Sequence, residues 1–202
     1  MSQTIRSFIA LELPDAVNSL LDNVQQELKS LRLKAKWVRP ENIHLTLKFL
    51  GNINPGAIED IGGAMADAAR DCVAFSLTVG GLGFFPNIKR PRVIWVGLGG
   101  EIQVLLNLQR NLEDRLATVG FPKEKRSFKA HLTLGRIRQA VDPAKIGQVI
   151  QEYSDLGYQK FTADRIILFK SDLKPSGAVY SPLKQTVLKM NNESAGQVLK
   201  IE

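Results

Sequence analysis

The tetrapeptide HLTL occurs twice, and it contains the only two histidines of the 202-residue chain, His44 and His131. The two motifs lie 87 residues apart, and the same order of hydrophobic patterns surrounds each of them. A duplicated unit restricts the chain to architectures in which two similar halves can pack against each other around one core. The sequence is therefore best interpreted as two halves, compared element by element.

The first half alternates predicted strands and helices. Proline at the first helical position and an acid beside it are typical helix-start signals, and Pro14 and Asp15 supply both. Apolar residues at helical spacing then predict a helix to about residue 31. The other predicted elements are a strand at 5–13, the strand with the first HLTL ending at Gly51, a helix at 54–70 and a strand at 73–82.

The second half repeats this order. We predict a strand at 92–98, a helix at 101–119 ended by Gly120, the strand with the second HLTL, a helix opened by Asp142 and Pro143, a strand at 162–171 and an extra strand at 178–188. The distance from the first strand to its histidine, 39 residues, is the same in both halves (Ile5 to His44 and Arg92 to His131).

These patterns predict an α+β fold with two pseudo-two-fold related β-α-β-α-β units, at about 5–82 and 92–171. We expect mainly antiparallel sheets facing a central groove, with the helices outside. A doubly wound parallel sheet is the alternative, but no glycine-rich phosphate loop follows a strand. The length fits one bilobal domain over residues 1–190, followed by a polar tail at 191–202.

The composition is that of an ordinary globular protein, with 44% hydrophobic and 23% charged residues. No apolar run approaches the roughly 18 residues that cross a bilayer. The N-terminal "FIALELP" is too short for a signal peptide. We therefore expect a cytoplasmic protein without a membrane partner, and a monomer, since nothing in the sequence demands a dimer. The single cysteine, Cys72, is expected to be a small buried residue.

The formal net charge is +7, and the basic residues are clustered. The stretches "KSLRLKAKWVR" (29–39) and "KEKRSFKAHLTLGRIR" (123–138) each lie on or just before an HLTL, and "IKRPR" (88–92) adds a third cluster. A single cluster is usually just a solvated surface, but two clusters tied to the two motifs favour a polyanionic partner. RNA or DNA is the obvious candidate.

Each motif places one imidazole beside one hydroxyl. Residues i and i+2 of a strand share a face, so His44 lies beside Thr46 and His131 beside Thr133, while the leucines face the core. In-line cleavage of a phosphodiester needs a base for the attacking oxygen and an acid for the leaving oxygen. Two histidines can supply both near neutral pH, and two hydroxyls can hold phosphate oxygens.

The histidines have two other interpretations. A lone strand histidine is more often structural, but a shared tetrapeptide in a shared register favours a joint role. A zinc site usually needs three or four protein ligands, and no cysteine or carboxylate sits at ligand spacing beside either motif. We therefore predict no metal and no cofactor.

The paired His-x-Thr motifs resemble the two-histidine (2H) phosphoesterase superfamily. The chain is most similar to its bacterial and archaeal RNA 2′,3′-cyclic phosphodiesterases, historically called 2′-5′ RNA ligases. Ala130 departs from the proline that the family often has before the second histidine. The matching stretches are "FIALELP" (8–14), "WVRPENIHLTLKFLG" (37–51), "GFFPNIKRPRVIWVGL" (83–98), "FKAHLTLGRIR" (128–138) and "LFKSDLKPSGAVYSPL" (168–183).

The resemblance implies hydrolysis of an RNA terminal 2′,3′-cyclic phosphate to a 2′-phosphomonoester. By analogy His44 is the proton donor to O3′ and His131 the proton acceptor from water, an assignment that the sequence could equally reverse. A 2′-5′ RNA ligase acting on RNA (tRNA) halves is an alternative that would use the same histidines. An RNA-binding module without turnover is the other, although binding alone needs no titratable rings.

Two further positions follow their histidines by five residues, Phe49 and Arg136. The resemblance implies that they clamp a nucleobase by stacking and cation–π contact. Strand alternation argues against this, because residue i+5 points away from residue i unless the strand bends. Alternation places Lys48 on the motif face, and we expect Arg138 there too; both would contact phosphates.

Overall fold

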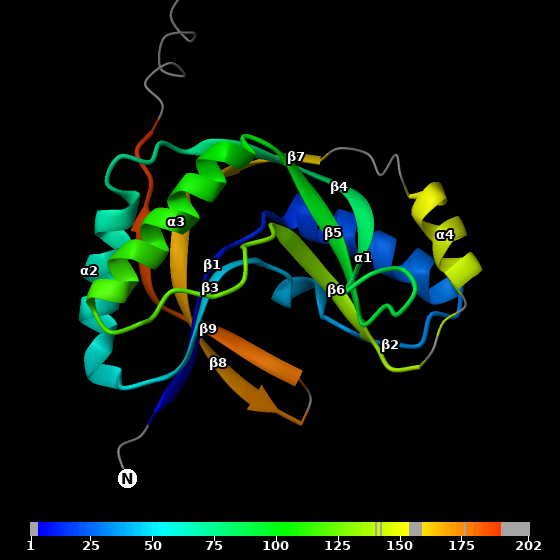
Figure 1. Cartoon of the computed structure of the whole chain (residues 1–202), viewed down its shortest axis with the longest axis horizontal. Helices are drawn as coiled ribbons and strands as arrows, with labels where there is room; N and C mark the ends of the chain where they lie inside the picture. The colour runs from blue at the N-terminus through cyan, green and yellow to red at the C-terminus, as the bar shows by residue number, and fades with distance from the viewer. Residues whose placement is uncertain (1–3, 140, 142, 154–158, 176, 191–202) are drawn as a thin grey trace, which may run out of the picture.

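The computed structural model describes residues 4–139, 141, 143–153, 159–175 and 177–190, and it shows a mixed α+β fold (Figure 1). Two sheets carry the strands, and helices cover their outer faces. The helices are α1 (Asp15–Ser30), α2 (Ile58–Ala69), α3 (Ile102–Thr118) and α4 (Pro143–Glu152), with short 3₁₀ turns at Pro40–Asn42 and Pro55–Ala57. The strands are β1 (Ile5–Leu11), β2 (Ala35–Trp37), β3 (Leu45–Ile53), β4 (Phe75–Phe85), β5 (Val93–Gly100), β6 (His131–Ile137), β7 (Gln159–Ala163), β8 (Arg165–Lys174) and β9 (Gly177–Val187).

The strands form a first sheet in the order β3-β1-β8-β9 and a second in the order β2-β6-β5-β4-β7. Every pairing between these strands is antiparallel, which confirms the α+β prediction over the parallel alternative. The order β3-β1-β8 in the first sheet corresponds to β6-β5-β4 in the second. The third strand of the first half, β4, therefore lies in the sheet of the second half.

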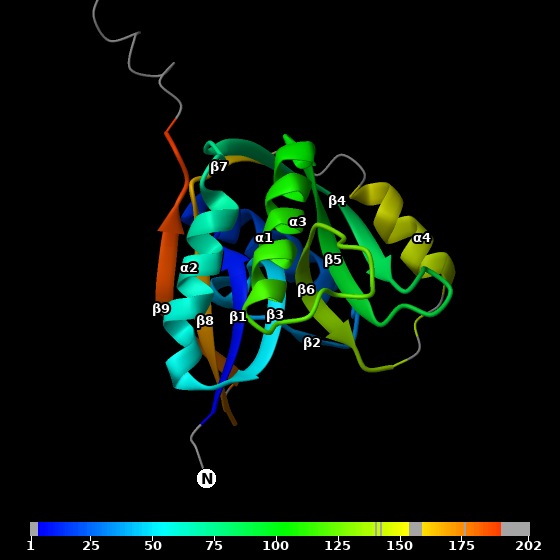
Figure 2. The same cartoon turned by 60° about the vertical axis from the view of Figure 1, so that its left-hand side comes forward.

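Two of the helices, α1 and α3, cross between the halves in the same way. Helix α3 follows β5 but packs with α2 beside the first sheet, while α1 and α4 lie on the second sheet (Figures 1 and 2). The buried face of α1 is formed by Val17, Leu21, Val24 and Leu28, as its helical spacing predicts. Because α1 and α3 each cover the other half's sheet, neither half encloses a core alone.

One buried cluster joins both sheets. Leu45 and Leu47 of the first motif belong to it together with Leu132 and Leu134 of the second. The prediction that these leucines face the core is confirmed. The Cys72 thiol is half-buried at the edge of this cluster, and burial raises its pKa. This is the behaviour of an apolar packing residue, and an unreactive thiol is expected.

Three predicted elements need correction. The strand expected at 162–171 is the end of β7 and most of β8, which lie in different sheets, because the chain changes sheet at Asp164. Strand β2 lies within the basic stretch 29–39, which had suggested no strand. Strand β3 continues past Gly51, whose φ of 73° suits glycine, to Ile53. Asp142 and the tail at 191–202 lie outside the described residues.

Within the part of the chain that the structure describes, no helix is both long and apolar enough to cross a membrane.

Candidate active site

The two histidines occupy equivalent positions in the two sheets. His44 directly precedes β3 and His131 is the first residue of β6, and both are half-buried. The Nδ1 atom of His44 lies 2.8 Å from the carbonyl oxygen of Asn42, and that of His131 lies 2.6 Å from the carbonyl oxygen of Lys129. A carbonyl can only accept, so each Nδ1 donates its hydrogen. Both rings are thus fixed in the same tautomer, with Nε2 left for chemistry.

Each HLTL ends in a β-bulge at its last leucine. In the first sheet Ala10 pairs with Thr46 and Ile9 with Lys48, which leaves Leu47 unpaired in the register. In the second sheet Trp95 pairs with Thr133 and Ile94 with Gly135, which leaves Leu134 unpaired in the register. A bulge inserts one residue and so shifts the alternation of faces beyond it.

The bulges reverse the expectation for the residues that follow them. Beyond the bulges, Phe49 and Arg136 return to the face of the His-x-Thr pair. Both side chains are exposed, Phe49 to 62%. The objection from strand alternation therefore does not apply to these two residues.

Lys48, in contrast, does not lie on the motif face, and the prediction that it contacts phosphate is wrong. Its side chain is only 4% exposed and turns into the core. Its Nζ atom donates to Glu113 Oε2 at 2.6 Å and to the Pro122 carbonyl oxygen at 2.7 Å. The bulge at Leu47 is the physical reason, because it moves Lys48 to the inner face. Arg138 directly follows β6 and is exposed, and its contact with phosphate stays a prediction.

Two buried glutamines hold the bulges, and sequence reasoning missed both. Gln25 of α1 donates through Nε2 to the Leu134 carbonyl oxygen at 2.9 Å and to the Val38 carbonyl oxygen at 2.7 Å. Gln109 of α3 donates to the Leu47 carbonyl oxygen at 3.4 Å. Each glutamine satisfies a carbonyl at the irregular point of the ladder, where an unpaired buried group would be costly. The signal in the sequence was a glutamine on the apolar face of each helix.

Aromatic rings surround the two imidazoles. His44 stacks on Phe8 with ring centroids 4.5 Å apart, and the Tyr180 ring meets it edge-on at 5.2 Å. The Phe49 ring centroid lies 6.2 Å from that of Phe8. His131 meets the rings of Phe85 at 5.0 Å and Trp95 at 6.4 Å, both near perpendicular. Each histidine is thus oriented by packing as well as by its Nδ1 hydrogen bond.

Burial changes the titration of this cluster. It lowers the pKa of His44 from 6.5 to about 4, against the opposing effect of the Asn42 carbonyl. Burial also raises the pKa of the Tyr180 hydroxyl, while the charges of Arg6 and Arg136 act in the opposite direction. Arg136 belongs to the second sheet and Tyr180 to the first, so the charge of Arg136 reaches the His44 side of the site.

The lowered pKa of His44 predicts a pH-dependent stability. Between pH 6.5 and 4 the unfolded chain takes up a proton on this ring and the folded protein does not, so stability falls as the pH falls through this window. The effect amounts to about 3 kcal/mol in total. Urea unfolding of the wild type and His44→Gln at pH 7 and pH 4 measures it, with the wild type losing more stability. Equal losses for the two proteins would contradict the assigned cause.

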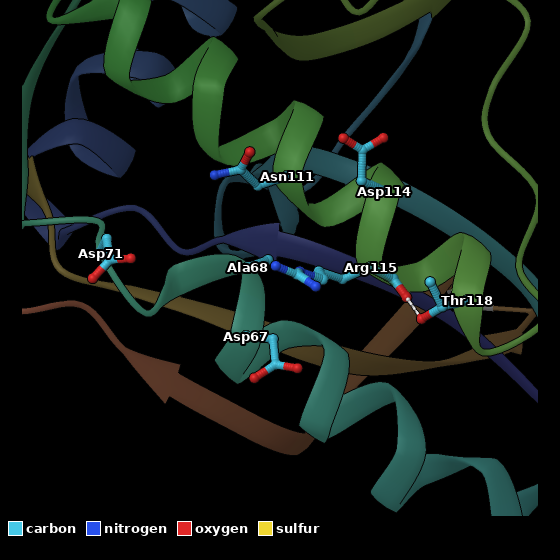
Figure 3. A pocket seen from close by; sticks show the side chains of 7 residues that line it. All are labelled: Asp67, Ala68, Asp71, Asn111, Asp114, Arg115 and Thr118. Atoms are coloured by element: carbon cyan, nitrogen blue, oxygen red, sulfur yellow. Dashed lines mark hydrogen bonds between the residues drawn. The ribbon is translucent and has the colours of Figure 1, made fainter.

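A hollow between α2 and α3 lies elsewhere (Figure 3). It is lined by Asp67, Ala68, Asp71, Asn111, Asp114, Arg115 and Thr118. Its three carboxylates are already paired: Asp67 with Arg70, Asp71 with Lys189 and Asp114 with Lys123. No histidine lines it, so we assign the candidate chemistry to the two motifs instead. Among the described residues, no three His, Cys, Asp or Glu side chains cluster as metal ligands would.

Two antiparallel sheets that each present one His-x-Thr pair define the class of two-histidine phosphoesterases. The sequence matches the family described as LigT like Phosphoesterase over residues 11–95 and 97–180, and the chain belongs to this family.

Relatives and solved structures agree with this assignment. The chain is 31% identical over 180 residues to the RNA 2′,3′-cyclic phosphodiesterase of Methanothermobacter thermautotrophicus (89% of this chain, 97% of that protein). It is 32% identical over 179 residues to that of Thermotoga maritima (89% and 93%). The crystal structure of TT0787 from Thermus thermophilus superposes with a TM-score of 0.75 at 26% identity (93% and 100%). E. coli LigT shares the fold, with a TM-score of 0.71 at 23% identity (93% and 99%).

Proposed function

We propose that this phosphoesterase hydrolyses a terminal 2′,3′-cyclic phosphate on RNA to a 2′-phosphomonoester, without a metal ion. The observation that carries the proposal is the equivalence of His44 and His131, which share one tautomer and one place relative to a β-bulge. Acid–base catalysis needs two such groups. The name of the relatives at 31% and 32% identity supplies the RNA substrate.

The reaction requires one proton transfer at each histidine. His131 Nε2 takes a proton from water, and the water oxygen attacks phosphorus as the bond from phosphorus to O3′ breaks. His44 Nε2 donates its proton to O3′, which leaves as a hydroxyl group. The hydroxyls of Thr46 and Thr133 hold the non-bridging oxygens. Solvent then restores the two starting protonation states.

The donor role of His44 depends on the substrate. In the free protein its pKa of about 4 keeps the ring neutral at pH 7. A phosphate anion against Nε2 favours the charged form and raises the pKa. Binding of the substrate would thus protonate His44, which then donates this proton to the leaving oxygen. The opposite assignment, with neutral His44 as the base, is the alternative, and a substrate with sulfur in place of O3′ separates the two.

Phe49 and Arg136 complete the site in this proposal. The exposed ring and the exposed guanidinium flank the terminal nucleobase, one from each sheet. Stacking on such groups tolerates any base, since every base has a π-face.

The test is to incubate the protein, in EDTA, with a short RNA ending in a 2′,3′-cyclic phosphate and to identify the product by chromatography. A 2′-phosphate is the expected product. A 3′-phosphate would contradict the assigned leaving group, and loss of turnover in EDTA would contradict metal independence. Tight binding without turnover would support a binding module instead.

A further inference from the structure

A second hollow lies on the β2-β6-β5-β4-β7 sheet, at the end of β6 opposite His131. The β4–β5 connection forms one side of it, and the segment that follows β6 forms the other. It is lined by Lys89, Arg90, Pro91, Arg92, Ile137, Arg138, Gln139 and Val141. Four of these residues are cationic and none is acidic, which makes the hollow a receptor for negative charge.

The four cations are available for a ligand. Within the described ranges none of them forms an ion pair, whereas several other surface cations, such as Lys123 and Lys189, do. The connection that presents three of them, Lys89, Arg90 and Arg92, is held by hydrogen bonds. Asn87 Oδ1 accepts from the backbone amides of Lys89 and Arg90, each at 3.0 Å, and the Arg92 amide donates to the Phe85 carbonyl oxygen at 2.7 Å.

Strand β6 links this hollow to the candidate active site. It begins at His131, passes Arg136 and leads into Arg138, a length of about 23 Å at about 3.3 Å per residue. Strand β2 adds further cations along this path. Lys36 pairs with Arg136, and the Lys34 carbonyl oxygen accepts from the Arg138 amide at 3.2 Å. Positive charge therefore extends from Arg136, near the candidate active site, to the hollow.

We propose that the hollow binds a backbone phosphate of the RNA several nucleotides from the reacting end. This rests on the proposed function: a cyclic phosphate closes the 3′ terminus, so the rest of the chain can leave the site only in the 5′ direction. Pro91, Ile137 and Val141 add an apolar wall beside the cations. That combination suits a nucleotide, with its phosphate on the cations and its sugar or base on the wall.

The test compares two substrates, a 2′,3′-cyclic mononucleotide and a twelve-nucleotide RNA with the same end. The variant is Lys89→Ala/Arg90→Ala, which keeps the two backbone amides that fix the turn. The control is Arg110→Ala/Lys160→Ala, which removes the same charge from exposed positions on α3 and β7.

The hollow variant is expected to raise KM for the long RNA about tenfold at low salt. Turnover of the mononucleotide stays unchanged. The slope of log affinity against log salt falls by about 0.7 for the one phosphate that the protein no longer neutralises. Equal behaviour of the hollow variant and the control, on both substrates, would overturn the proposal.

Binding of a twelve-nucleotide RNA with a 2′-phosphate end, followed by fluorescence anisotropy, separates the two proposals. If the wild type hydrolyses neither substrate, the proposed activity fails. Weaker binding by the hollow variant than by the control still supports the hollow as an RNA site. Equal binding contradicts it.

Discussion

Replacing His131 by alanine is expected to lower kcat for cyclic phosphate hydrolysis by about 10²–10⁴-fold, and His44→Ala by a similar factor. Each variant removes one proton transfer and leaves the rest of the site in place. Because the two rings act on one transition state, the double variant should be little worse than either single one. Initial rates with a cyclic mononucleotide measure all three losses.

The control for these variants is glutamine at the same positions. Glutamine keeps a polar group beside Phe8 or Phe85 but cannot exchange a proton near pH 7. The glutamine variants should be as inactive as the alanine variants, and RNA binding should be retained in both sets. Either histidine variant with nearly full activity, in a protein that unfolds normally, would refute the paired mechanism.

Replacing Glu113 by glutamine is expected to destabilise the fold by about 3–5 kcal/mol. The carboxylate is the partner of Lys48, which is buried beside the bulge, and the substitution leaves that ammonium without its counter-charge. Glu113 also accepts from Gln109 at 3.2 Å and from the Glu124 amide at 3.0 Å, so it joins α3 to β3 and to the following segment. Urea unfolding at pH 7 measures the loss.

The neighbouring ion pair supplies the matched control. Asp114 pairs with Lys123 on the surface of the same helix, so Asp114→Asn should change stability by at most about 1 kcal/mol. Similar losses in the free energy of unfolding for Glu113→Gln and Asp114→Asn would show that Lys48 is better solvated than its burial indicates. The double variant Lys48→Met/Glu113→Leu, which removes both charges, should recover much of the stability.

Much of the fold could be predicted because duplication and periodicity are local signals. The spacing of Val17, Leu21, Val24 and Leu28 defines the buried face of α1 without knowledge of its partner. The exchange of β4 and β8 between the sheets could not be predicted in this way. A buried strand has the same apolar pattern in either sheet, and only the completed core decides the pairing.

The candidate site was predictable only as far as its strands are regular. The placement of His44, Thr46 and their equivalents follows from alternation alone, because the strand is regular there. The next residues were not predictable, since Leu47 and Leu134 are bulged. Those bulges depend on amide groups that arrive from distant helices, Gln25 and Gln109. Alternation consequently placed Lys48 on the wrong face and argued against Phe49 and Arg136.

The central claim is that one histidine protonates the leaving O3′ while the other activates water. A cyclic phosphate with sulfur in place of O3′ tests it most directly, because a thiolate leaves without a proton. On this substrate His44→Ala should recover most of the wild-type rate, and His131→Ala should remain inactive. Recovery of His131→Ala instead would reverse the two roles, and recovery of neither would contradict acid catalysis by a histidine at O3′.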